Sequence, residues 1–190
     1  MTVYRCHLFG SPSLATPTGD SIPIRSRKGA GLLASLALAE GRPVGRDQLC
    51  DLLWPDRQTP QARASLRQLQ VDVRRDLGLA DEVFDTRSDG AISYNPMAIV
   101  FDVGEFNRLR LSDDRQSLEQ AFALRRGQFI EGPAPREATF AEWIDVSRRS
   151  LDNSWCEATA RLLRVLDRQA DHNQALEVAI RLLSVNRRTI

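Results

Sequence analysis

Alternating apolar and polar positions at the start of the chain predict a small antiparallel sheet. Side-chain character alternates over residues 3–9 and breaks at Gly10-Ser11-Pro12, which is typical of a strand followed by a turn. Two shorter extended segments are expected at residues 13–16 and 21–24, divided by Gly19-Asp20. Because the three segments follow one another closely, we expect them to form one sheet.

Helical spacing replaces this alternation from residue 27 onward. Apolar residues three and four positions apart predict helices over residues 27–39, 46–54 and 59–77. Gly41, Pro55 and Gly78 follow these segments and are typical of helix ends. We expect Thr59 to cap the third helix, with Pro60 at its first position.

A β-hairpin is predicted directly after the third helix. Residues 83–84 and 92–94 are β-prone, and the segment between them ends in Asp89-Gly90, a strong hairpin signal. The sheet, the three helices and the hairpin together define a first domain, which we place at residues 1–98.

Residues 99–190 predict a second, all-α domain. Helices are expected over residues 103–109, 117–124, 140–168 and 173–185. The last two of them carry facing apolar stripes, which is typical of helix pairs stacked in a repeat-like array. The final helix has no covering layer, so we expect this domain to be truncated.

Composition indicates a globular protein and argues against a strongly basic one. Hydrophobic residues make up 42% and charged residues 27% of the 190 residues, far from the composition of disordered chains. The net charge is only +1, which by itself disfavours a nucleic-acid-binding protein. The three cysteines form no C-x-x-C pair, and no apolar run is long enough for a signal peptide or a membrane span. We expect a cytoplasmic protein that has no contact with membranes.

Signals for catalysis, metal ions or cofactors are weak. The two histidines, His7 and His172, have no second ligand at metal-binding spacing. Residues 27–31 superficially resemble a phosphate-binding loop, but Lys28 precedes the glycines, which is the wrong order. No G-x-S-x-G motif is present. We therefore expect a protein that is not an enzyme and needs no metal and no cofactor.

The third predicted helix carries a concentration of arginines on the side away from its core. Its expected buried stripe consists of Ala62, Leu66, Leu69, Val73 and Leu77. Residues 57–75 contain five arginines and one acidic residue, a local charge of +4 in a chain of net charge +1. Charge is therefore uneven along the chain, and the total conceals it.

This arginine-rich face has two interpretations. Arginine can bind guanine through two hydrogen bonds, glutamine can bind adenine, and small apolar groups can touch thymine methyl groups. The helix residues predicted to contact DNA in this way are Arg63, Arg67, Gln68, Val71, Arg74 and Arg75. A solvated surface is the competing interpretation, and the helix alone does not decide between them.

The order of elements favours DNA binding. Two helices across a tight connection, followed by a hairpin, form the winged variant of the helix-turn-helix, in which the last helix enters the major groove. Arg87 lies at the hairpin tip and would make a second contact. Helix starts could bring Arg27, Lys28 and Arg46 to phosphates. The acidic residues that balance these charges, Asp47, Asp51 and Asp56, are expected on the side facing away from DNA.

Several motifs in order resemble bacterial regulators of the antibiotic-regulatory-protein type. In the first domain they are Leu8-Phe9-Gly10, Leu32-Leu33-Ala34-x-Leu36-Ala37-Leu38, Asp47-Gln48-Leu49, Leu52-Leu53-Trp54-Pro55-Asp56, Ala62-Arg63-x-Ser65-Leu66-Arg67 and Val73-Arg74-Arg75-Asp76-Leu77-Gly78. In the second they are Phe101-Asp102-x-x-x-Phe106, Arg126-Gly127-x-Phe129-Ile130-x-Gly132 and Phe140-x-x-Trp143-x-x-x-x-Arg148. The resemblance covers nearly the whole chain.

The resemblance implies an OmpR-type winged helix followed by a tetratricopeptide-like bacterial transcriptional activator domain. It further implies a transcription activator that binds double-stranded DNA at promoters, as a homodimer on direct repeats, and contacts RNA polymerase. The chain departs from the family pattern in its short helical domain. A helical adaptor whose arginine face docks an acidic protein partner is the alternative function.

Overall fold

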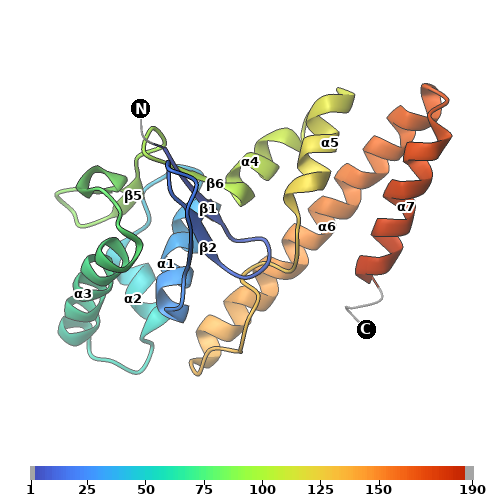
Figure 1. Ribbon diagram of the computed structural model, residues 1–190. Coiled ribbons are helices and arrows are strands. Elements are labelled where there is room, and N and C mark those ends of the chain that lie inside the picture. Colours follow the sequence, from blue (N-terminus) through green and yellow to red (C-terminus); the bar gives the residue numbers. More distant parts are fainter. Residues whose placement is uncertain (1–2, 187–190) are drawn as a thin grey trace.

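The structure, a computed structural model, describes residues 3–186 and has a mixed α+β architecture (Figure 1). Within that range a small sheet and seven α-helices follow one another, with a short hairpin after the third helix. The sheet and α1 lie near the middle of the molecule, α3 and the hairpin lie at one end, and α7 lies at the other (Figure 1).

The sheet has four strands rather than the three expected. The predicted strands are confirmed as β1 (Tyr4–His7), β2 (Ser13–Ala15) and β3 (Ser21–Pro23), which pair antiparallel. The fourth strand, β6 (Ile99–Phe101), runs parallel to β1, and the Tyr4 amide donates to the Ala98 carbonyl at 2.8 Å. A strand of three residues is too short to show alternation, and its partner is distant in sequence. The strand lies just beyond the predicted boundary after residue 98.

The three helices next to the sheet are confirmed at nearly their predicted positions. They are α1 (Arg27–Leu38), α2 (Arg46–Leu53) and α3 (Thr59–Leu77). The expected Thr59 cap is wrong: Gln58 has the extended backbone of the cap position, and Thr59 is already the first helical residue. Gly78 ends α3 in the left-handed conformation with φ +60°, as glycine at this position allows.

The predicted hairpin is confirmed by the register of its strands. After a 3₁₀ turn at Asp81–Val83, β4 (Phe84–Thr86) pairs antiparallel with β5 (Ile92–Tyr94), so that Thr86 lies opposite Ile92. The backbones of Val44 and Ile92 exchange two hydrogen bonds of 2.8 and 2.9 Å. The hairpin is thereby joined to the connection between α1 and α2.

The second half of the described chain consists of four helices that pack in sequence. They are α4 (Asp102–Leu109), α5 (Arg115–Leu124), α6 (Ala138–Arg168) and α7 (His172–Asn186). Each contacts the next, and α5, α6 and α7 lie side by side in Figure 1. The predicted helices agree with these within two residues at each end.

One apolar core runs through both halves of the chain. It contains residues of the sheet and α1 together with Phe106, Phe140 and Trp155 of the later helices. Phe9 and Phe106 meet edge to face with ring centroids 5.5 Å apart. A smaller cluster around Leu162 and Leu166 joins α5, α6 and α7. The predicted division into two domains is therefore not matched by a division of the core.

The junction between the sheet and the later helices is held by polar contacts as well. The Asp102 carboxylate is fully buried and accepts hydrogen bonds from the amides of Leu8, Phe9 and Val103 at 2.8–3.0 Å. Burial raises the pKa of Asp102 to about 6. Arg148 of α6 donates to the carbonyls of Phe129 and Ile130, both at 2.8 Å. These bonds fix the sheet against α4 and the loop before α6 against that helix.

Candidate nucleic-acid interface

The core-facing stripe of α3 is as predicted and determines which side of the helix faces outward. Each of the five stripe residues is no more than 8% exposed: Ala62, Leu66, Leu69, Val73 and Leu77. Gln70 is also buried. On the opposite side, Gln68, Val71 and Arg75 are exposed, and Val71 keeps 52% of its surface accessible.

A hollow of about 310 Å³ lies between α3, the start of α2 and the hairpin. Its lining includes four arginines and no acidic residue: Arg46, Arg63, Leu66, Arg67, Gln70, Val71, Arg74, Thr86, Gly90 and Ile92. The N-terminus of α2 adds the positive end of a helix dipole. The hollow is therefore a concave, positively charged surface with one exposed apolar side chain at its edge.

Arg46 reaches this hollow because the hairpin has a glycine beneath it. Arg46 is the first residue of α2, and its guanidinium lies directly over the Cα of Gly90. A Cβ at residue 90 would overlap the guanidinium. Gly90 also has φ +82°, which side-chain-bearing residues rarely adopt. Arg46 was predicted as a phosphate contact, and the structure brings it together with the arginines of α3.

Arg74 is held against the hairpin from the other side. Its guanidinium carbon lies 5.3 Å from the centroid of the Phe84 ring, in a cation–π contact. Its Nε is buried and has no hydrogen-bond partner among the described residues. Phe84 therefore orients Arg74 along the wall of the hollow.

Arg67 and Val71 are the residues of α3 that line the hollow and are exposed to solvent. Arg67 is exposed, and in residues 3–186 no hydrogen bond or ion pair engages its side chain. Val71 follows one turn later on the same helix. An unpaired guanidinium next to an exposed methyl-bearing side chain presents both a hydrogen-bonding fork and an apolar contact outward.

Arg63 is bound by an acidic partner within the chain. Its Nε and Nη2 donate to the two carboxylate oxygens of Asp47, both at 2.9 Å. The hydrogen bond from Arg63 lowers the pKa of Asp47, and the same bond raises the pKa of Arg63. The expectation that Asp47 faces away from this surface is wrong, because α2 packs beside α3 and brings the carboxylate to the edge of the hollow.

Gln68 and Arg75 lie outside the hollow, on the neighbouring exposed face of α3. Gln68 donates to Asp72 at 3.0 Å. Arg75 pairs with both Asp72 and Asp76 at 3.0 Å, and the hydrogen bond to Asp76 is the main cause that raises its pKa. Their functional groups are thus engaged with acidic residues of the same helix.

Three further predicted residues lie elsewhere. Arg87 is exposed in the hairpin turn, where its backbone pairs with Ala91. Arg27 donates to the carbonyls of Ile130 and Glu131 at 3.1 and 3.4 Å, and burial lowers its pKa. Lys28 pairs with Glu137 at 2.6 Å and lies 4.8 Å from the ring centroid of Trp54. Arg27 and Lys28 therefore bind the segment before α6 and not the hollow.

Thr86 and Gln70 line the hollow but were not predicted. The hairpin signal contained the information for Thr86, because a turn over residues 87–91 leaves Thr86 opposite Ile92 at the end of the ribbon. Helical spacing places Gln70 near the core boundary on the flank of Arg63, Arg67 and Arg74, but it assigns the side chain no contact with DNA.

The hollow suits an anionic, hydrogen-bonding surface such as a nucleic-acid groove. Arginine forks match phosphate oxygens and the edge of guanine. In the part of the chain that the structure describes, no group of three or more His, Cys, Asp or Glu side chains could hold a metal ion. Within the same residues, no helix is both long and apolar enough to cross a membrane.

The chain has the fold of a known bacterial protein. No protein-family model matches the sequence, and no curated protein matches it either. Among solved structures, the chain is similar to Mycobacterium tuberculosis EmbR, determined in complex with a low-affinity phosphopeptide, with a TM-score of 0.63 and 16% sequence identity. The match covers 96% of this chain and 59% of EmbR. The two proteins therefore share a fold over this region, and the chain spans about three fifths of the length of EmbR.

Proposed function

We propose that the chain is a sequence-specific DNA-binding transcription regulator of the antibiotic-regulatory-protein type, acting as an activator. The observation that carries the proposal is the hollow between α3 and the hairpin, with four arginines and no acidic lining residue. In this proposal α3 enters the major groove as the recognition helix of a winged helix-turn-helix, and the hairpin is the wing.

In this proposal, side chains of α3 that line the hollow and have no acidic partner contact the DNA bases. Arg67 and Arg74 would bind guanine, and Val71 would contact a thymine methyl group. Arg46 and Arg63 would bind phosphates, and Arg87 would touch the neighbouring backbone from the wing. Gln68 and Arg75 would take part only after leaving Asp72 and Asp76. The proposal excludes Arg27 and Lys28, because backbone carbonyls and Glu137 already engage them.

The fold that the chain shares with EmbR over 96% of its length supports this proposal at the level of architecture. The helical half, in which α4 to α7 pack in sequence, fits a tetratricopeptide-like activator domain that binds other proteins. RNA polymerase is the partner that the family resemblance implies. The proposal gives no residue of the chain a catalytic role.

The test is a titration of double-stranded DNA at two salt concentrations, using sequences first selected from a random pool. We expect binding that weakens as salt rises, because phosphate contacts release counterions. Arg67→Ala should cost about 1–3 kcal/mol and relax specificity at one base pair. Arg168→Ala, at an exposed arginine at the end of α6, is the matched control and should bind as the wild type does.

Absent or salt-insensitive binding by the wild type would refute DNA binding. The spacing of sites in the selected sequences also reports stoichiometry, because a dimer on direct repeats requires two half-sites in the same orientation. A single isolated site would contradict the homodimer on direct repeats that the family resemblance implies, while leaving DNA binding intact.

A further inference from the structure

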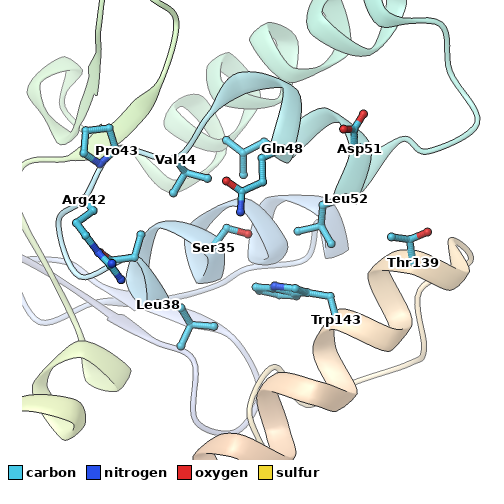
Figure 2. A pocket seen from close by; sticks show the side chains of 12 residues that line it. Ser35, Leu38, Arg42, Pro43, Val44, Gln48, Asp51, Leu52, Thr139 and Trp143 are labelled. Atoms are coloured by element: carbon cyan, nitrogen blue, oxygen red, sulfur yellow. The ribbon is translucent and has the colours of Figure 1, made fainter.

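A second hollow, of about 840 Å³, lies on another side of the molecule between α1, α2 and the start of α6 (Figure 2). Its walls come from both halves of the chain, since Leu38 and Leu52 belong to α1 and α2 whereas Trp143 belongs to α6. We call it the interhelical cleft. Its volume lies within the range of small-molecule sites, about 300–1,000 Å³.

One wall of the interhelical cleft is flat and apolar. The Trp143 indole packs on one side near Phe129 and Phe140, with ring centroids 6.3 and 6.1 Å away. The ring is nevertheless only partly buried, and it extends from α6 into the cleft beneath Leu52 (Figure 2). Leu38 and Leu52 are also partly exposed there. An aromatic ring that packs against other rings on one side and is exposed on the other can stack with a flat ligand.

The polar groups of the cleft are arranged by charge. Arg42 lies at one end, where its Nε donates to the Ala39 carbonyl at 3.1 Å. Its two terminal nitrogens have no partner within residues 3–186. Asp51 lies at the other end of the cleft in Figure 2 and likewise has no hydrogen-bond or ion-pair partner in the described chain. The cleft thus has a cationic end and an anionic end, and between them Leu38 and Trp143 lie on one side, with Ser35 and Gln48 on the other (Figure 2).

The backbone before Arg42 has a left-handed conformation that turns the chain back over the end of α1. Glu40 and Gly41 both have positive φ, +53° and +83°. Glu40 directly follows the last turn of α1, where a residue in the left-handed conformation commonly ends a helix. This turn of the backbone places Arg42 at the mouth of the cleft.

We infer that the interhelical cleft binds a small aromatic acid. The flat body of the ligand would lie against Trp143 and Leu52, its acidic group would bind the free nitrogens of Arg42, and a hydroxyl or amine at its far end would face Asp51. Size, apolar wall and charge arrangement each favour this class of ligand.

Ligand binding is expected to influence the arginine-lined hollow, a consequence that rests on the proposed function. Val44 lines the interhelical cleft, and its backbone is bonded to Ile92, which lines the other hollow. The same short connection leads directly into Arg46. A ligand that fixes this connection would therefore fix the position of a DNA-contacting residue.

The test uses the whole chain without DNA and the fluorescent probe 8-anilinonaphthalene-1-sulfonate, a flat aromatic anion. We expect saturable binding of one probe per chain. Arg42→Gln should weaken it about tenfold, the effect of one hydrogen bond to a charged group. N-phenyl-1-naphthylamine has the same rings without the anion, and its binding should not change in Arg42→Gln.

Two further variants make the result specific. Thr139→Trp places a bulky side chain into the cleft from an exposed position of α6 and should abolish probe binding, with circular dichroism confirming the fold. Arg168→Gln is the control, because its Nε also donates to a carbonyl one turn earlier, Arg164, outside the cleft. Absence of saturable binding, or equal binding by wild type, Arg42→Gln and Thr139→Trp, would overturn the assignment.

The influence on DNA is measured separately, by repeating the DNA titration at saturating probe. We expect the DNA affinity of the wild type to change and that of Thr139→Trp to stay constant. An unchanged wild-type affinity would overturn the coupling. Failure of DNA binding in every condition would refute the proposed function, but it would leave the probe titration valid as evidence for the cleft.

Discussion

Arginines occur in two regions of this molecule with opposite surroundings. At the junction, Arg27 and Arg148 donate to the carbonyls of the loop before α6. At the hollow, Arg67 has no partner within residues 3–186, and Arg46 and Arg74 lie against a glycine and an aromatic ring. The guanidinium groups of the junction stabilise the fold, whereas in the hollow only Arg63 is paired, with Asp47, and no hydrogen bond or ion pair within residues 3–186 engages the side chains of the other three arginines. Changes at the junction should therefore lower stability, whereas changes at the hollow should alter DNA affinity.

The junction should show a pH dependence that comes from Asp102. Burial raises its pKa from 3.8 to about 6, so the folded state binds more protons than the unfolded state between those pH values. The free energy of unfolding should therefore fall by about 3 kcal/mol as pH rises from about 4 to about 6, because of this group, and should stay constant above that pH. Urea unfolding of wild type and Asp102→Asn, compared at the two pH values, isolates the effect. A constant difference between the two proteins would contradict it.

Arg148→Ala should lower the free energy of unfolding by about 2 kcal/mol, because it leaves the Phe129 carbonyl without its side-chain donor and the Ile130 carbonyl with Arg27 alone. Urea unfolding measures it, with Arg168→Ala expected within about 0.5 kcal/mol of wild type. If Arg67→Ala destabilised the fold as much as Arg148→Ala, the contrast between junction and hollow would be lost.

Gly90→Ala should disturb the hollow through Arg46. The added Cβ would displace the guanidinium, and the positive φ would cost about 1 kcal/mol of stability. DNA affinity should fall as it does in Arg46→Ala. Because both changes remove one contact, the double variant should bind no more weakly than either single one. Additive losses in this cycle would show that Gly90 does not position Arg46.

Asp47→Asn should have the smallest effect and the opposite sign. The carboxylate competes with phosphates for Arg63, so its loss should strengthen DNA binding for all sequences and steepen the salt dependence by about one ion. Asp51→Asn removes the same charge one turn further along α2, where no arginine is paired with it in the described chain, and serves as the control. Equal strengthening in both variants would indicate net charge rather than release of Arg63.

The charge counted along α3 in the sequence differs from the unpaired charge in the structure. Residues 57–75 contain five arginines and one acidic residue, but Arg63 pairs with Asp47 and Arg75 with Asp76, both outside that window. The excess of positive charge in this segment of the sequence is therefore partly neutralised in the folded protein. Arg46, conversely, was expected only to bind phosphate and joins the arginines of α3 because the hairpin folds beneath it.

The helices, the hairpin and the buried stripe of α3 can be predicted from local sequence, because periodicity, helix-ending glycines and the Asp-Gly turn act between residues close along the chain. The pairing of β6 with β1, the partners of Arg27 and Arg63, and the interhelical cleft become visible only in the folded molecule. Each of these brings together groups far apart in sequence. Their contacts depend on how the elements pack, and no local pattern of residues encodes that packing.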